Sequence, residues 1–224
     1  MIISRGRNYI FVHIPKTGGT ALTLALEARA MKDDILIGDT PKARARKARL
    51  AKLKPVGRLW KHATLADIDG IVSAQDLRTM FTLTLVRNPW DRAVSYYHWL
   101  REQRFAHSAV ALSKALNFSD FLNHEQTKMA FKNWPASAYM RTAQGDESCR
   151  LFLRLEHLDQ DIVPFEAHLG FKLVPLQRVN DSKRQADWRP YYSEADAALL
   201  ATLCSEDITR FGYRFDDVRK GDPA

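Results

Sequence analysis

The stretch from residue 9 to residue 28 constrains the fold more than any other part of the chain. It begins with the apolar run Tyr9–Ile14, whose β-branched and aromatic residues are typical of a strand buried on both faces. It ends with Ala21–Ala28, where alanine and leucine favour a helix. A short turn, Pro15–Thr20, joins the two. The sequence therefore predicts a strand, a tight turn and a helix in direct succession.

The residues of this turn have the chemistry of a phosphate-binding loop. Gly18 and Gly19 permit a positive φ and a close approach of the backbone to a ligand. The helix that follows offers unpaired N–H groups and the positive end of its dipole. Lys16 adds a full charge, and Thr17 and Thr20 add hydroxyl groups. Together they predict a site for a phosphate group, although an ordinary strand-to-helix turn is the alternative.

A second junction between a strand and a helix follows later in the chain. The run Met80–Val86 predicts a strand, and Asn88–Asp91 supplies an N-cap asparagine, a proline at the first helical position and an acid in the first turn. Arg87 stands at the junction and can grip a phosphate through two hydrogen bonds, with Ser95 two turns into the helix. The alternative for Arg87 and Ser95 is a surface salt bridge and an ordinary helix serine.

The rest of the chain continues the alternation of strands and helices. Two more strands and two more helices are predicted, at residues 33–39, 151–156, 159–170 and 193–211. This order predicts an α/β fold, a P-loop-like three-layer arrangement with a central, mostly parallel sheet flanked by helices. Ligands of such sheets bind at the carboxyl ends of the strands, where Lys16 and Arg87 both fall. Two cations at two strand ends predict a ligand with two separated phosphate groups.

Charge narrows the class of ligand without selecting one. The net charge is +8, which favours anionic partners such as nucleotides, acidic glycans, nucleic acid or acidic membranes. Residues 42–61 hold nine Lys and Arg residues and no acid, and their alanine and leucine content predicts a helix that ends before Pro55. This basic segment is either a solvated surface or one that attracts an acidic acceptor or the phosphates of a nucleotide.

Length and composition indicate a single domain, residues 1–224, with a real apolar core. No apolar run approaches the ~20 residues that span a bilayer, so we expect no transmembrane segment. The first strand begins so early that we expect no signal peptide or anchor before it. Cys149 and Cys204 do not form a disulfide framework, and free thiols in a reducing compartment are the expectation.

The two junctions, taken together, resemble a known family. Pro15–Thr20 is similar to the 5′-phosphosulfate-binding loop of sulfotransferases, and Val86–Tyr97 is similar to their 3′-phosphate-binding segment. Weaker similarities follow in the expected order, at His62–Thr64, Arg154–Leu158, Asn180–Ser182 and Asp207–Tyr213. The pattern is closest to the carbohydrate (membrane-type) sulfotransferases and their bacterial relatives.

The resemblance implies a donor and an acceptor. The family transfers the sulfuryl group of 3′-phosphoadenosine 5′-phosphosulfate (PAPS) to a hydroxyl or amine, here of a glycan or a small hydroxyl compound. It implies no metal, because Lys16 can neutralise the charge of the departing 5′-phosphate. The backbone amides of Thr17 to Thr20, with the threonine hydroxyls, would bind that phosphate.

The resemblance also assigns the remaining binding residues. Arg87 and Ser95 would bind the 3′-phosphate of PAPS. A polar segment that would close over the nucleotide holds Arg178, Asn180, Ser182, Lys183 and Arg184.

A base must accept the proton of the attacking hydroxyl, and the resemblance favours His62 for this role. An imidazole with an unperturbed pKa of about 6.5 suits a base near neutral pH. Glu156 and His13 are rivals, although the place of His13 inside a strand indicates a structural histidine.

Parts of the chain depart from the family pattern. Eukaryotic members of this group usually carry an N-terminal anchor. Because we expect no anchor in this chain, we expect a bacterial, cytoplasmic relative. The segment at about 105–145 has no match, and we expect a helical insert there that shapes the acceptor site.

Other classes of protein fit less well. A P-loop NTPase or small-molecule kinase would have the same architecture, but in that motif the lysine follows the glycines, whereas Lys16 precedes them. A nucleotide- or glycan-binding protein without catalysis would not need Lys16. Only net charge supports a nucleic-acid-binding protein, and we expect no nucleic acid as a partner.

Overall fold

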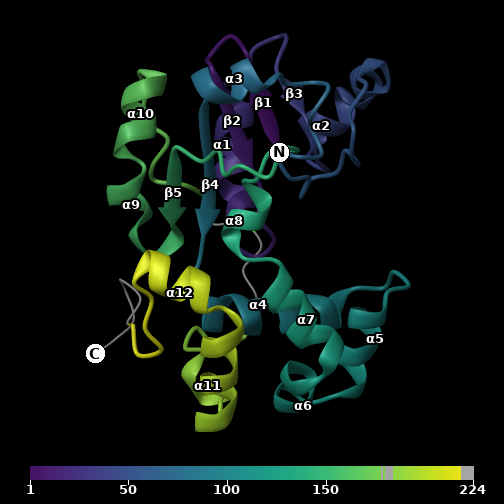
Figure 1. Cartoon of the computed structure of the whole chain (residues 1–224), viewed down its shortest axis with the longest axis vertical. Coiled ribbons are helices and arrows are strands. Elements are labelled where there is room, and N and C mark those ends of the chain that lie inside the picture. The colour runs from purple at the N-terminus through teal and green to yellow at the C-terminus, as the bar shows by residue number, and fades with distance from the viewer. Residues whose placement is uncertain (178, 180–183, 218–224) are drawn as a thin grey trace. The chain divides into compact units, whose positions relative to one another are not determined.

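The computed structural model describes residues 1–177, 179 and 184–217 (Figure 1). The chain divides into two compact units. The sheet unit comprises Met1–Val86 and Ala136–Val179, and the helical unit comprises Arg87–Pro135 and Asn180–Ala224. Among the described residues, no helix combines the length and the apolarity that a membrane crossing requires.

The sheet unit is built on five strands in the order β3–β1–β2–β4–β5. Their bounds are β1 Ile2–Ser4, β2 Tyr9–Val12, β3 Ile35–Leu36, β4 Phe81–Val86 and β5 Leu151–Arg154. The strands β2, β4 and β5 pair in parallel, whereas β1 is antiparallel to both β2 and β3. Only β1 therefore runs against the other described strands, and the predicted central, mostly parallel sheet is confirmed.

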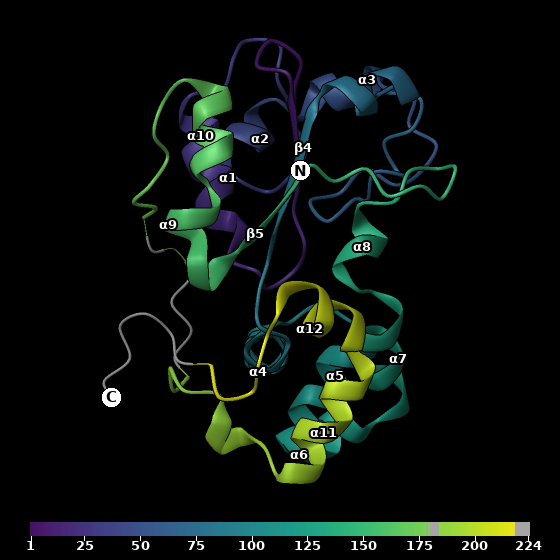
Figure 2. The ribbon, with the colours of Figure 1, turned by 60° about the vertical axis from the view of Figure 1, so that its left-hand side comes forward.

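Helices flank this sheet. Those of the sheet unit are α1 Gly19–Ala28, α2 Pro41–Ala45, α3 Ala74–Thr79, α8 Ala136–Tyr139, α9 Leu158–Asp161 and α10 Val163–Leu169, with the 3-10 turns η1 Lys47–Lys52 and η2 Leu155–His157. In Figure 2 the sheet is seen nearly edge-on, and α1, α9 and α10 lie on the same side of it. Phe11, Leu83 and Leu153 from three strands pack there against Leu22 of α1 and Phe165 of α10. Each of these buried side chains stabilises the fold by about 1.5–3 kcal/mol.

Two features of the sheet unit differ from the sequence prediction. The short strand β1 was not predicted; it forms a hairpin with β2 through a turn that ends at Asn8, whose φ of 53° asparagine tolerates well. The predicted helix over the basic segment is wrong in its extent. It divides into α2 and η1 at Arg46, which leaves helical geometry and donates from its guanidinium to the carbonyl of Met31 at 2.8 Å.

The helical unit is organised around α4, Pro89–Glu102. Its other helices are α5 Ser108–Ala115, α6 Phe118–Asn123, α7 Glu125–Asn133, α11 Glu194–Leu203 and α12 Ser205–Phe211, with the 3-10 turn η3 Arg189–Tyr191. Tyr97 of α4 packs against Phe118 and Phe121, with ring centroids 5.5 and 5.2 Å away. Ser193 caps α11 by accepting from the N–H of Asp196, as the sequence predicts.

Candidate active site

The predicted phosphate-binding turn lies between β2 and α1, and we call residues 15–20 the phosphate loop. Gly18 is the N-cap of α1 with a φ of 82°, and Lys16 has a φ of 65°. A left-handed lysine is uncommon, and such conformations concentrate at binding sites. Because Gly18 has no side chain to cap α1, the first backbone N–H groups of the helix are left for an anion.

Both glycines of the loop are required by their neighbours. A Cβ on Gly18 would lie 2.7 Å from a methyl carbon of Leu155. A Cβ on Gly19 would lie 2.3 Å from Cδ2 of His13, because the His13 ring packs directly on the loop backbone. The side chains of Leu155 and His13 therefore pack closely against the backbone of the phosphate loop.

The two threonines of the loop differ in what they can offer. Thr17 is buried, and its hydroxyl donates to the carbonyl of Ile14 at 2.9 Å. A hydroxyl has one hydrogen to donate, so the Thr17 side chain closes the turn and its backbone N–H is the group that can face a phosphate. Thr20, in the first turn of α1, is partly exposed.

His62 is fixed against the strand that leads into the loop. Its Nδ1 lies 2.7 Å from the carbonyl oxygen of His13, which can only accept, so Nδ1 carries the proton and Nε2 is the basic nitrogen. The rings of His62 and His13 meet edge to face, with centroids 4.9 Å apart. Burial lowers the pKa of His62 to about 4, so its imidazole is neutral at pH 7.

The two rival bases occupy different environments. His13 is buried, and burial with the neighbouring positive groups lowers its pKa well below the ordinary value. Its ring packs on Gly19 and its carbonyl accepts from His62, which are structural roles.

Glu156, the other rival base, lies in η2, directly after β5, and is partly exposed. The adjacent Arg154 is held by two guanidinium bonds of 2.9 Å to Asp161.

The second predicted phosphate segment belongs to the helical unit. Asn88 caps α4 by accepting from the N–H of Trp90 at 3.1 Å, and Pro89 occupies the first helical position, as predicted. Asp91 is fully buried and binds Nε of Arg87 at 2.8 Å. It also pairs with the guanidinium of Arg184.

We call Arg87 and Arg184 the arginine pair. Their side chains are 10% and 4% exposed, and one carboxylate, that of Asp91, lies between them. Burial and the charge of Arg87 lower the pKa of Arg184 to about 10, so the Arg184 guanidinium is still charged at pH 7. Two buried guanidiniums close to one another attract anions such as phosphate, because buried charges are little screened by water.

Ser95 lies one turn beyond Asp91 on the same face of α4. It is only 6% exposed. His98, on the next turn, has a buried Nε2 and stacks edge to face on Tyr191 at 5.2 Å. This face of α4 therefore carries Asp91, Ser95 and His98 in succession behind Arg87.

Sequence reasoning placed Arg184 in a segment near the nucleotide, but it missed the role of Asp91 and the ion pair between Asp91 and Arg184. Asp91 was interpreted only as an acid in the first turn of a helix, and the signal that could have suggested more is its spacing of four residues from Arg87. Arg184 is far away in sequence, so no local pattern connects it to Arg87. The other residues predicted for that segment, Arg178, Asn180, Ser182 and Lys183, lie outside the described residues.

The fold defines a class: an α/β protein in which a glycine turn with Lys16 joins a central strand to a helix, and Arg87 precedes a second capped helix. A family model described as the sulfotransferase family matches residues 1–216. The chain therefore belongs to the sulfotransferase family. The predictions of an enzyme, of sulfuryl transfer and of PAPS as the donor are thereby confirmed.

Two further comparisons complete these findings. The structure of mouse sulfotransferase SULT7A1 complexed with PAP is similar over 92% of this chain and 85% of that chain, with 17% sequence identity and a TM-score of 0.48. No curated protein matches the sequence. In the described parts of the chain, no group of three or more His, Cys, Asp or Glu side chains is arranged to hold a metal ion.

Proposed function

We propose that this sulfotransferase acts on a hydroxyl or amine of a carbohydrate, with Lys16 and His62 as its catalytic residues. One observation carries the proposal. His62 donates to the carbonyl of His13 at 2.7 Å, and the His13 ring packs on Gly19, in the same loop as Lys16. A cation for the leaving group and a neutral imidazole for the acceptor thus belong to the same compact unit.

The phosphate loop binds the 5′ end of the donor. PAPS supplies the sulfuryl group and carries a phosphate at each end of its ribose. The backbone N–H groups of Thr17, Gly19 and Thr20 donate to the 5′-phosphate at the N-terminus of α1. The ammonium of Lys16 neutralises the negative charge that grows on this phosphate as the sulfuryl group departs. Positioning and charge neutralisation account for most of the catalysis, as in phosphoryl transfer.

The second segment binds the 3′-phosphate. Arg87 and Ser95 hold this group, and Arg184 joins them through its shared partner Asp91. The burial of both guanidiniums supports the assignment, because desolvated cations bind phosphate more strongly than exposed ones. On the family resemblance alone, we assign further nucleotide contacts to the segment 180–183.

His62 acts as the base. Its Nδ1–H is occupied by the carbonyl of His13, so the lone pair of Nε2 accepts the proton of the acceptor hydroxyl as its oxygen attacks sulfur. We further propose that the insert, with α5 to α7, shapes the acceptor site, and that the enzyme is cytoplasmic, as its cysteine content suggests.

A thermal shift experiment tests the donor site. Adenosine 3′,5′-bisphosphate at 100 times its Kd should stabilise the protein by about 2.7 kcal/mol and raise the Tm by about 5 to 10 °C. ATP with magnesium should have a much smaller effect, since it lacks the 3′-phosphate. Equal or greater stabilisation by ATP would refute the donor assignment.

A variant then separates binding from catalysis. Lys16→Ala should lower sulfuryl transfer from labelled PAPS at least about 100-fold, the loss expected for one group that stabilises a transition state. Its Tm should still rise with the bisphosphate. Lys32→Ala removes an exposed lysine beyond α1 and is the matched control. Full turnover by Lys16→Ala would exclude Lys16 from catalysis.

A further inference from the structure

Trp60 is exposed beside the proposed base. It has 44% of its surface exposed, which is far more than core packing leaves to a tryptophan. Its ring meets that of His62 edge to face, with centroids 5.1 Å apart and an interplanar angle of 84°. The contact with His62 covers part of the indole, while much of its surface is open to solvent.

Arg58 lies over this tryptophan. Its guanidinium carbon is 5.6 Å from the centroid of the Trp60 ring, a cation–π arrangement, and the side chain is exposed. A guanidinium held by a ring in this way keeps its outer N–H groups for a carboxylate or a sulfate. We call Arg58 and Trp60 the acceptor platform.

The backbone under the acceptor platform is fixed. The N–H groups of Val56 and Gly57 donate to the carbonyls of Asp69 and Asp67, at 2.8 and 3.0 Å. A Cβ on Gly57 would lie only 2.6 Å from Cα of Asp67, so the two segments are in direct contact. On the other side, the N–H of Ala63 donates to the carbonyl of Trp60 at 2.9 Å. Backbone hydrogen bonds therefore hold the segment that carries the platform in place before an acceptor binds, which lowers the entropic cost of binding.

A continuous series of contacts joins the platform to the phosphate loop. Trp60 touches His62, His62 is bonded to His13, and His13 packs on Gly19. All four residues belong to the sheet unit. A molecule that lies on Trp60 is consequently next to the base that would accept its proton.

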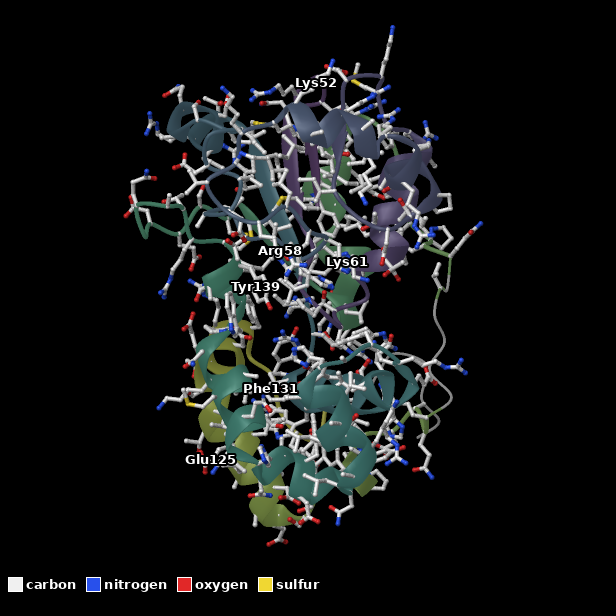
Figure 3. The ribbon with its side chains drawn as sticks, turned by 90° about the vertical axis from the view of Figure 1, so that its right-hand side faces the viewer. Lys52, Arg58, Lys61, Glu125, Phe131 and Tyr139 are labelled. Carbon is white, nitrogen blue, oxygen red and sulfur yellow. The ribbon has the colours of Figure 1, made fainter. Side chains whose placement is uncertain are left out.

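The charge around the platform favours an acidic molecule. The basic segment 42–61 contains no acidic residue. In Figure 3, Lys52 lies well apart from Arg58 and Lys61, so this segment runs across the sheet unit and only its last part reaches the platform. Lys61 pairs with Asp39 at 2.8 Å, whereas the guanidinium of Arg58 faces the Trp60 ring instead of a carboxylate.

We propose that Arg58 and Trp60 select the acceptor, and that this acceptor is a glycan carrying carboxylate or sulfate groups. The sugar lays its C–H face on the indole of Trp60, and an acidic group of the same or the next residue pairs with Arg58. His62 Nε2 then faces a hydroxyl of the bound sugar. The inference rests on the proposed sulfuryl transfer with His62 as base.

The experiment compares acceptors of equal length. Hexasaccharides of hyaluronan, chondroitin and N-acetylheparosan carry carboxylates, whereas those of chitin and cellulose are neutral. With labelled PAPS, at least one acidic hexasaccharide should have a KM about tenfold or more below that of either neutral one, the difference expected from one charged hydrogen-bonded pair.

Variants assign this preference to the platform. Arg58→Gln should raise the KM for the acidic acceptor about tenfold and leave the KM for neutral acceptors unchanged. Trp60→Ala should raise the KM for both kinds about tenfold, and Trp60→Phe should restore most of the affinity. Lys52→Gln removes the same charge from the same segment and should change neither value. In all three platform variants the Tm shift with adenosine 3′,5′-bisphosphate should equal that of the wild type.

Each outcome bears on the inference. Equal use of acidic and neutral hexasaccharides, or the same effect from Lys52→Gln as from Arg58→Gln, would overturn it. A protein that binds the bisphosphate and sulfates a sugar, but whose KM is insensitive to Trp60→Ala, would overturn the platform while leaving the proposed function intact. If neither the bisphosphate binds nor any sugar is sulfated, both proposals fail.

Discussion

His62 shows how a single side chain is prepared for its task. The bond from Nδ1 to the carbonyl of His13 selects the tautomer, and burial lowers the pKa to about 4. The imidazole is therefore already neutral at physiological pH, and a backbone carbonyl orients it. A base with so low a pKa is a weak one, because general-base catalysis is most efficient when the pKa of the base lies near the operating pH.

We expect His62→Gln to lower kcat about 100-fold or more, the usual contribution of a general base. In the wild type, kcat should be flat from pH 6 to 8 and fall at lower pH with a midpoint near 4. The variant should lose this acidic limb and keep the Tm shift with adenosine 3′,5′-bisphosphate. Steady-state kinetics across pH check both points.

Glu156→Gln is the comparison for this prediction. It removes the charge of the rival base in η2 with little change of shape. If it abolishes turnover while His62→Gln does not, then Glu156 is the base and His62 is structural.

The first turn of helix α4 carries Asp91, whose carboxylate pairs with both Arg87 and Arg184. Asp91 is fully buried, and its removal would take away a carboxylate that both arginines share. We expect Asp91→Asn to destabilise the protein by about 3 kcal/mol, as breaking a buried ion pair does. The added 3′-phosphate of a ligand replaces the lost charge, so the Tm shift with adenosine 3′,5′-bisphosphate should be larger in Asp91→Asn than in the wild type.

Adenosine 5′-monophosphate is the control, because it lacks the 3′-phosphate. Its Tm shift should be no larger in Asp91→Asn than in the wild type. If both nucleotides stabilise the variant to the same extent, the 3′-phosphate does not bind at the arginine pair.

Elements made from one continuous run were predictable from sequence. The strand, turn and helix of residues 9–28 and the capped helix after Arg87 follow from local composition, and both are present as β2–α1 and α4. Features that depend on contacts between residues far apart in the sequence were not predictable. The basic segment would continue as a helix by propensity, but Arg46 turns to bond Met31. The bond from the Thr17 hydroxyl to the carbonyl of Ile14, which closes the turn, was not predicted either.

For the whole molecule, the buried histidines predict a loss of stability in mild acid. Folding lowers the pKa of both His13 and His62, so below pH 6.5 the unfolded chain binds protons that the folded chain does not. The stability is complete above the unfolded pKa of about 6.5 and falls as the pH drops towards 4. Each histidine contributes a slope of at most about 1.4 kcal/mol per pH unit.

Urea unfolding at pH 7.5, 6.0 and 5.0 measures this slope. The His62→Gln variant should show a smaller loss between pH 6.0 and 5.0 than the wild type, since one of the two groups no longer titrates. An identical loss in the two proteins would mean that His62 is protonated to the same extent in the folded and unfolded chain.

The class of reaction was within reach of the sequence, whereas the acceptor was not. Two local motifs, around Lys16 and Arg87, are specific enough together to indicate sulfuryl transfer. By contrast, Arg58 and Trp60 gain their meaning only from packing against His62, and Asp91 only from the approach of Arg184. These contacts form only when the chain folds, so the sequence alone does not predict them.

The packing of the His13 ring on Gly19 links two positions that a reader of the sequence would treat as separate. A Cβ at residue 19 would meet that ring at 2.3 Å, so any side chain there requires something smaller than an imidazole at residue 13. The same ring stands under His62. Positions 13, 19 and 62 should therefore vary together among relatives, and a lineage that exchanges one of them must exchange its neighbours in the same evolutionary step or lose the alignment of base and loop.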